Sequence, residues 1–158
     1  MPSPNSRPES RASSTFGIKP IRPETGYGYI KSAPSSEAGV REVLSFVEKP
    51  NAETAARYLE EGGYCWNSGM FVMRASTWLA ALEMYRNDIA RACRVAWDER
   101  TPDGHFVRPG REEFAAVPSE SVDYAVMERC VGGPWLLRMV PLQAGWSDLG
   151  AWDAVWQS

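Results

Sequence analysis

The sequence predicts a protein of the α/β class, in which helices pack on a sheet. Strand-like segments and helical segments follow one another along the chain without an internal repeat. The chain has 158 residues, of which 44% are hydrophobic and 23% charged, so it is long enough to bury one core. We expect about four or five strands, several of them short.

The first 15 residues predict a disordered leader. They are nearly all Pro, Ser, Arg and other polar types, which cannot bury enough apolar surface to offset chain entropy. We therefore divide the chain into a leader over residues 1–15 and a folded unit over residues 16–158. A Gly- and Pro-rich stretch opens that unit and leads into a short aromatic strand at residues 27–30.

A stronger strand is expected at residues 40–49. Leu44, Phe46 and Glu48 would share one of its faces. Pro50 ends this strand and favours an extended backbone at Lys49.

Asn51 is a good N-cap for a helix over residues 52–61, which the following glycine pair ends. The remaining elements are a strand at 70–73, helices capped by Ser76 and Asn87, turns at 100–110, a helix at 121–130, a strand at 135–140 and a helix at 151–156.

Charge and cysteine usage narrow the functional classes. Seventeen Lys and Arg against 20 Asp and Glu give a net charge of -3 without a long basic run, which argues against nucleic-acid binding. A phosphorylated small substrate needs only one or two cations. Three widely spaced cysteines and one histidine argue against a zinc site and for a reducing compartment. Without a membrane-length apolar segment or signal core, we expect a cytoplasmic protein.

Two segments suit a sugar phosphate. Gly26 and Gly28 flank Tyr27, so the backbone there can approach a ligand closely, although these residues taken alone favour a plain turn into a strand. Glu48 can accept hydrogen bonds from sugar hydroxyls, and Lys49 can neutralise a phosphate. The alternative for this pair is a surface ion pair worth about 0–1 kcal/mol.

Two further segments carry polar groups in Gly-containing loops. Asn67 offers two donors and an acceptor, which suits a vicinal diol, or it belongs to an ordinary turn before a strand. Asp148 can bind Mg²⁺, which usually takes one or two carboxylates from a protein. Alternatively, Ser147 or Asp148 only caps the following helix.

Together with one more segment, these resemble the type II mannose-1-phosphate guanylyltransferases of the sugar nucleotidyltransferase superfamily. The segments are TFGIKPIRPETGYGYI, FVEKP, WNSGMFVM, SVDYAVME and WSDLGAW, and the likeness runs from residue 16 to about residue 156. The resemblance implies a partial Rossmann-like nucleotidyltransferase fold that lacks its N-terminal nucleotide-binding strands. It also implies the reaction of GTP with mannose 1-phosphate to give GDP-mannose and pyrophosphate.

The resemblance further implies residue roles. It assigns the mannose 1-phosphate to Gly28, Glu48, Asn67 and Lys49. Asp148 would supply one ligand of a Mg²⁺ cofactor, so Lys49 and Asp148 would be the catalytic groups. Asp123 lies in a matching motif, in which it either touches the sugar or supports the fold. Ala151 stands where the family pattern has a small polar serine.

The front of the chain departs from the family. A Gly-rich loop of the GGxGxRLWPLS kind, whose amides would cradle GTP, does not occur, and neither does the lysine-bearing segment after it. We therefore expect an incomplete chain, truncated or mis-started, that binds GTP only when the missing N-terminal half is supplied. Its sheet would expose an edge. Whether it forms a homo-oligomer stays open.

Three functions follow. The first is an enzyme of GDP-mannose synthesis that acts once completed. The second is a non-catalytic sugar-phosphate-binding or regulatory remnant, which we favour for these 158 residues alone. The third is a hydrolase that pairs Glu48 with Asp123 or Asp148. GTP dependence of a completed chain would count against this third function.

Overall fold

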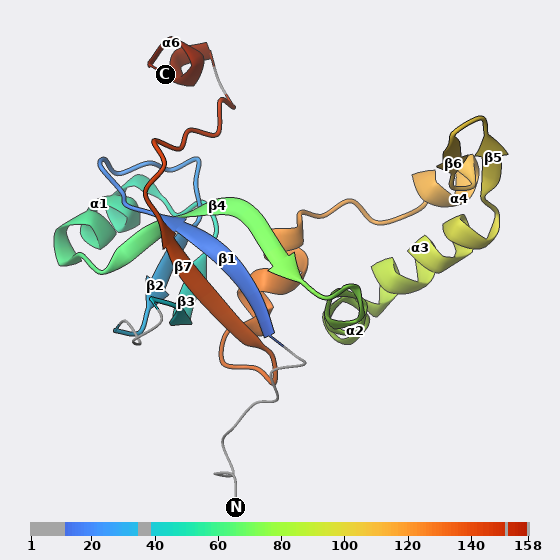
Figure 1. The fold of residues 1–158 in the computed structure, drawn as a ribbon, viewed down its shortest axis with the longest axis horizontal. Coiled ribbons are helices and arrows are strands. Elements are labelled where there is room, and N and C mark those ends of the chain that lie inside the picture. The colour runs from blue at the N-terminus through green and yellow to red at the C-terminus, as the bar shows by residue number, and fades with distance from the viewer. Residues whose placement is uncertain (1–11, 35–38, 151, 158) are drawn as a thin grey trace, which may run out of the picture.

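The computed structural model describes residues 12–34, 39–150 and 152–157, and its centre is a closed barrel of five strands (Figure 1). In barrel order the strands are β1 (Ala12–Ile18), β4 (Tyr64–Met73), β2 (Tyr29–Ser32), β3 (Arg41–Val47) and β7 (Leu136–Leu142). Within the described barrel, β1 and β7 run parallel and the other neighbours antiparallel. A mixed sheet with helices agrees with the α/β class. The expected open edge is wrong, because the sheet closes on itself.

Strand β1 begins inside the predicted disordered leader. Ser13 and Thr15 are buried, because β1 pairs with β4 on one side and with β7 on the other. The predicted boundary at residue 15 is therefore wrong for residues 12–15. Residues 1–11 of that leader lie outside the described residues.

A β-bulge breaks the alternation expected in β3. Lys31 and Ser32 of β2 oppose Ser45 and Val43, so one extra residue of β3, Leu44, lies between these pairs. Val43 is consequently buried, as is Phe46, whereas Leu44 is exposed. The expected face shared by Leu44 and Phe46 is therefore wrong.

Helix α1 (Ala52–Glu61) packs against the barrel and matches its expected bounds. The Asn51 side chain accepts a 2.8 Å hydrogen bond from the Thr54 N–H, which caps the first turn. Ala55 and Tyr58 on its inner face pack into one core cluster with barrel residues such as Tyr29.

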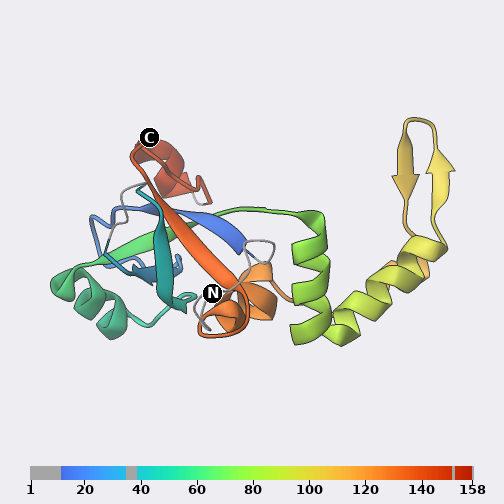
Figure 2. The ribbon, with the colours of Figure 1, turned by 60° about the horizontal axis from the view of Figure 1, so that its bottom comes forward.

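An arm of four elements extends away from the barrel (Figures 1 and 2). It comprises α2 (Ala75–Tyr85), α3 (Asn87–Asp98), the hairpin of β5 (Thr101–Asp103) and β6 (Phe106–Arg108), and α4 (Arg111–Ala115). The hairpin occupies the region predicted as turns. Neither Ser76 nor Asn87 is an N-cap, because the residues before α2 and α3 are Arg74 and Arg86.

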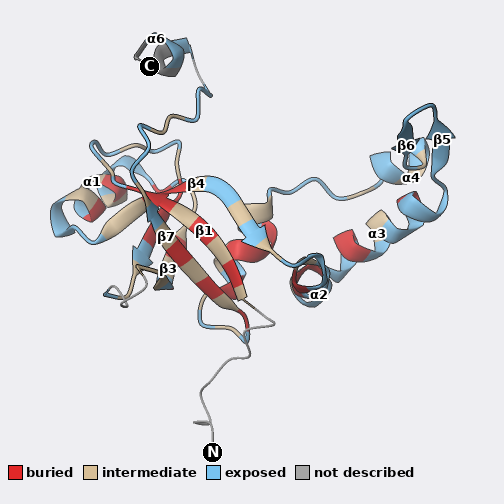
Figure 3. Ribbon diagram, in the orientation of Figure 1, coloured by how far each residue is buried: buried red, intermediate tan, exposed pale blue. Residues whose placement is uncertain are grey.

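One helical segment joins the arm to the barrel. It consists of the π-helical turn η2 (Asp123–Met127) and the short helix α5 (Glu128–Cys130). Val126 and Cys130 share a buried cluster with α2 and α3, and Met127 belongs to the barrel core. Figure 3 shows this buried junction between the barrel and the arm.

The chain's last described element is α6 (Trp152–Gln157), which lies beyond the barrel in Figure 1. Among the described residues, no helix has the length and apolar character that a membrane crossing requires.

Candidate functional site

Five of the six predicted site residues meet where one end of the barrel faces η2. Gly28 precedes β2, Glu48 and Lys49 follow β3, Asn67 lies within β4, and Asp123 begins η2. The resemblance grouped these residues without geometry, and the fold brings them together. What they bind stays a prediction.

Asn67 is the centre of a buried hydrogen-bond network. Its Oδ1 accepts from the Thr15 hydroxyl at 3.1 Å and from the Gly69 N–H at 3.2 Å. Its Nδ2 donates to Asp123 Oδ1 at 2.9 Å, and its backbone N–H donates to the Gly28 carbonyl at 2.7 Å. The side chain thus retains one amide hydrogen for a ligand. Asn67 lies inside a strand, so the turn alternative is wrong, and β4 begins before the expected residue 70.

Gly28 lies directly against the Glu48 carboxylate and leaves little room for a Cβ atom. A Cβ atom at this position would overlap Glu48 Oε2 and lie 3.2 Å from the Asn67 Cβ. Glycine therefore lets the Glu48 carboxylate lie directly against the backbone of the loop before β2.

Glu48 presents a buried carboxylate with one unsatisfied oxygen. Its side chain is 9% exposed, and Oε2 has no hydrogen-bond partner among the described residues. Oε1 lies 3.7 Å from the Lys49 ammonium, whose side chain is 55% exposed. Burial raises the Glu48 pKa, the charge of Asp123 adds to this, and Lys49 opposes it. A buried acceptor without a donor is costly, so a ligand that donates here would bind favourably.

Asp123 is held close to this carboxylate. Burial raises its pKa, while the hydrogen bond from Asn67 opposes that shift. The Asp123 side chain accepts this hydrogen bond from Asn67, so Asp123 helps to hold the Asn67 side chain in position.

The backbone at Lys49 is left-handed, with φ of 47°, and the extended conformation expected before Pro50 is therefore wrong. Two residues of the η2–α5 segment contact the backbone of the preceding residue, Glu48. The Glu48 N–H donates to Glu128 Oε1 at 3.1 Å, and the Tyr124 hydroxyl donates to the Glu48 carbonyl at 3.4 Å.

Sequence reasoning missed three residues of the site: Thr15, Tyr124 and Glu128. Tyr124 and Glu128 lie in the SVDYAVME segment, four positions apart, and helical spacing places such a pair on one face. That spacing was an available signal for them. Thr15 opens the TFGIKPIRPETGYGYI segment, but its polar neighbours suggested disorder, so it was placed in the leader.

Asp148, the sixth predicted site residue, follows β7 in the chain and is exposed. It accepts a 2.8 Å hydrogen bond from the Tyr27 hydroxyl. The Tyr27 ring meets Trp66 and Trp146 edge-on, with centroids 5.2 and 5.5 Å away. Tyr27 directly precedes Gly28 in the chain. The hydrogen bond from Tyr27 to Asp148 therefore links the Asp148 loop to a residue adjacent to the Glu48 cluster. Burial, then the Asp148 hydrogen bond and charge, raises the pKa of Tyr27 to about 12.

Asp148 alone fits only part of a metal site. The described residues contain no group of three or more His, Cys, Asp or Glu side chains that could hold an ion. One exposed carboxylate still suits Mg²⁺, which commonly combines one or two carboxylates with phosphate oxygens and water.

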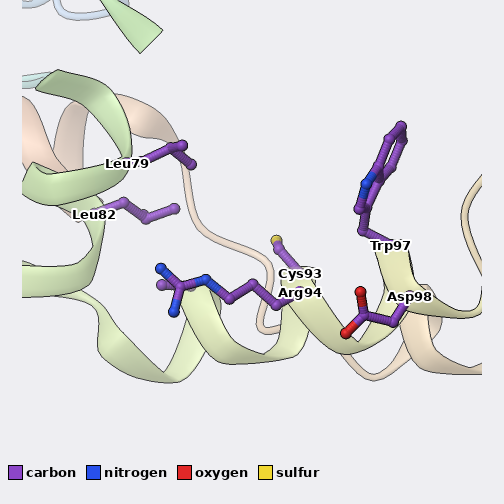
Figure 4. A pocket seen from close by; sticks show the side chains of 7 residues that line it. Leu79, Leu82, Cys93, Arg94, Trp97 and Asp98 are labelled. Atoms are coloured by element: carbon purple, nitrogen blue, oxygen red, sulfur yellow. The ribbon is translucent and has the colours of Figure 1, made fainter. Parts of the chain in front are cut away.

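A separate groove of about 510 Å³ lies on the arm (Figure 4). It is lined by Leu79, Leu82, Ala90, Cys93, Arg94, Trp97 and Asp98, from α2 and α3. Arg94 pairs with Glu83 at 3.3 Å. This groove is mainly apolar and contains none of the predicted site residues, so polar sugar recognition is better served by the Glu48 cluster.

Known proteins resemble nearly the whole chain. The mannose-1-phosphate guanylyltransferase of Escherichia coli (strain K12) is 50% identical over 147 residues, which cover 90% of this chain and 30% of that protein. The xanthan biosynthesis protein XanB of Xanthomonas campestris pv. campestris (strain B100) is 48% identical over 141 residues, which cover 89% and 29%. The chain thus spans about 30% of the length of these relatives.

Solved structures share the fold. A mannose-1-phosphate geranyltransferase from Thermus thermophilus superimposes with a TM-score of 0.75 at 31% identity, covering 92% of this chain and 39% of its own. A mannose-6-phosphate isomerase from Helicobacter pylori gives 0.74 at 31% identity, covering 86% and 51%. Residues 5–158 match the family model described as nucleotidyl transferase. This chain belongs to the nucleotidyl transferase family.

Proposed function

We propose that this chain supplies the sugar-phosphate side of a mannose-1-phosphate guanylyltransferase. In that reaction a phosphate oxygen of mannose 1-phosphate attacks the α-phosphate of GTP, GDP-mannose forms and pyrophosphate leaves. The observation that carries the proposal is the buried Glu48 Oε2, which lies against Gly28 without a donor.

The chemistry of the cluster suits a sugar phosphate. Glu48 would accept hydrogen bonds from sugar hydroxyls, and Asn67 would donate its remaining amide hydrogen. Lys49 is beside Glu48 and half exposed, so its ammonium would meet the phosphate while Glu48 holds the sugar. Asp123 orients Asn67 in this scheme. The names of the relatives support mannose as the sugar.

These residues would contribute by positioning and by neutralising charge. Phosphoryl transfer needs little covalent chemistry from the protein when the attacking and leaving oxygens are aligned. Lys49 would lower the repulsion between the sugar phosphate and the triphosphate. Bound Mg²⁺ would neutralise developing phosphate charge, and we propose that Asp148 is one of its ligands.

We further propose that the barrel is the sugar-binding portion of a Rossmann-like nucleotidyltransferase domain, and that the protein works in the cytoplasm. The structural neighbours support the first statement. The second is supported by the three free cysteines, Cys65, Cys93 and Cys130.

Calorimetric titration of the chain with mannose 1-phosphate tests the binding half of the proposal. Lys49→Ala should weaken binding at least about tenfold, because a phosphate loses its cation. Lys19→Ala is the matched control, since that exposed lysine lies outside the cluster. An absence of binding by the unaltered chain, or equal losses in both variants, would reject the assignment.

A second pair tests the contact between the glycine loop and Glu48. Gly28→Ala places a methyl group on Glu48 Oε2, whereas a methyl group at Gly26 meets the Glu24 carboxylate at an ordinary contact distance of 3.4 Å. We expect Gly28→Ala to abolish most of the affinity and Gly26→Ala to preserve it. Equal affinities would remove Glu48 from the ligand.

The catalytic half requires GTP. This chain can replace the matching segment of the Escherichia coli relative, and the chimera can be assayed for pyrophosphate release with GTP and mannose 1-phosphate. Asp148→Asn in the chimera should reduce turnover more than sugar-phosphate binding, because it weakens the metal site. Equal turnover of both chimeras at saturating substrate would exclude Asp148 as a metal ligand.

A further inference from the structure

One helical segment, η2–α5, binds both backbone polar groups of Glu48. The Glu48 N–H donates to Glu128 Oε1 at 3.1 Å, and the Glu48 carbonyl accepts from the Tyr124 hydroxyl at 3.4 Å. These partners lie 80 and 76 residues further along the chain. Two long-range side-chain contacts on the two polar groups of one residue therefore fix the orientation of that residue.

The next residue needs such support. Lys49 has φ of 47°, in the left-handed region that a residue with a Cβ atom adopts only at a cost. Pro50 follows and disfavours compact backbone conformations of Lys49 as well. Strained backbone of this kind persists only where the surrounding structure determines it. The contacts of Tyr124 and Glu128 with the adjoining residue supply that determination.

The π-helical turn brings the required side chains to one face. The Glu128 N–H donates to the Asp123 carbonyl five residues earlier. With this wider turn, Asp123 contacts Asn67 while Tyr124 and Glu128 contact Glu48. Turns of this kind occur frequently at functional sites.

Electrostatics alone would not place Glu128 here. Its negative charge adds to burial and to Asp123 in disfavouring the ionised form of Glu48. A carboxylate in this position is explained by its role as an acceptor for the Glu48 N–H.

We propose that Tyr124 and Glu128 are positioning residues that hold the Glu48–Lys49 turn, so that the carboxylate and the ammonium face one sugar phosphate. The inference rests on the proposed function for its ligand, mannose 1-phosphate. The conformation of the turn can be tested without any ligand.

The test compares Glu128→Ala with Glu128→Gln in the full chain. Carbon chemical shifts of Lys49 report its φ, and calorimetry gives the affinity for mannose 1-phosphate. In Glu128→Ala the Lys49 shifts should move toward extended values and the affinity should fall roughly tenfold. Glu128→Gln keeps an acceptor oxygen, so its shifts and affinity should stay near those of the unaltered chain.

Tyr124→Phe is the second variant, because it removes only a hydroxyl. It should shift the Lys49 resonances in the same direction as Glu128→Ala, and it carries the test if Glu128→Ala unfolds. Unchanged Lys49 shifts in these two variants overturn the positioning role. An equal loss of affinity in Glu128→Gln and Glu128→Ala overturns the role of Glu128 as a backbone acceptor. If the unaltered chain does not bind mannose 1-phosphate, the proposed function fails while the Lys49 shifts still decide the positioning role.

Discussion

The Tyr27 hydroxyl donates a 2.8 Å hydrogen bond to Asp148, which lies 121 residues further along the chain. The bond joins the loop before β2 to the loop after β7. Because a phenolate could not donate it, the folded chain favours the protonated tyrosine. Burial acts in the same direction and is the larger cause of the raised pKa.

Tyr27 should therefore make stability sensitive to alkaline pH. In the folded chain its pKa is about 12, against 10.0 ordinarily, so its contribution is complete below pH 10 and disappears between pH 10 and 12. Urea unfolding across this range should show the loss in the unaltered chain and a weaker loss in Tyr27→Phe. Asp148→Asn, the control, should lower the Tyr27 pKa in a near-ultraviolet titration. Identical pH profiles for all three proteins would contradict the prediction.

Glu48→Gln should stabilise the unliganded chain while weakening its binding of mannose 1-phosphate. The folded chain favours protonated Glu48, so its contribution to stability is complete below the ordinary pKa and is lost as pH rises through the raised value. Removing the buried charge should add about 1 kcal/mol to the free energy of unfolding at pH 7. Urea unfolding and calorimetry measure the two effects. A less stable variant that still binds would show that Glu48 serves the fold.

The left-handed backbone at Lys49 predicts a difference between two substitutions. Lys49→Gly and Lys49→Ala both lose the ammonium and should bind mannose 1-phosphate equally poorly. Lys49→Gly should nevertheless be more stable by about 0.5–1 kcal/mol, because relief of left-handed strain exceeds the added entropy of the unfolded chain.

The same pair of substitutions at Lys31 is the control. Lys31 lies in β2, where glycine should be the less stable of the two. If glycine is also the less stable residue at position 49, the strain is not relieved by removing the Cβ atom.

Thr15→Val should loosen Asn67. Valine has a similar shape but cannot donate, so Asn67 Oδ1 keeps only the Gly69 N–H as a partner. We expect a loss of about 1 kcal/mol in urea unfolding and a shift of the Asn67 side-chain amide resonances. Thr15→Ser retains the hydroxyl and should leave those resonances in place. Matching spectra for Val and Ser would remove Thr15 from the network.

The elements that the sequence predicted well are those that local chemistry determines. Asn51 and the glycine after residue 61 define α1 because both act within one helical turn. The motif residues around Glu48 and Asn67 identified the cluster, since each motif lies at a strand end or within a strand that reaches it.

The features that were missed depend on distant pairing. Ala12–Ile18 becomes a strand because β4 and β7 bond to it, since the local sequence with Ser13 and Ser14 does not by itself indicate one. The bulge at Leu44 depends on the register with β2. The left-handed Lys49 conflicts with the local preference set by Pro50, and contacts from η2 and α5 accompany it. No sequence pattern within ten residues of these positions predicts the strand, the bulge or the left-handed backbone.

The parallel pairing of β1 with β7 sets the order in which the molecule can be assembled. Residues 12–18 pair along their whole length with residues 136–142, so this ladder closes a loop of more than 100 residues. Contacts between such distant segments form slowly, because chain entropy is lost before the contact is gained. During synthesis, β1 can pair with β4 long before its second neighbour exists. One side of β1 thus stays unpaired until residues 136–142 have been made, and an unpaired strand edge of this kind is prone to misassembly.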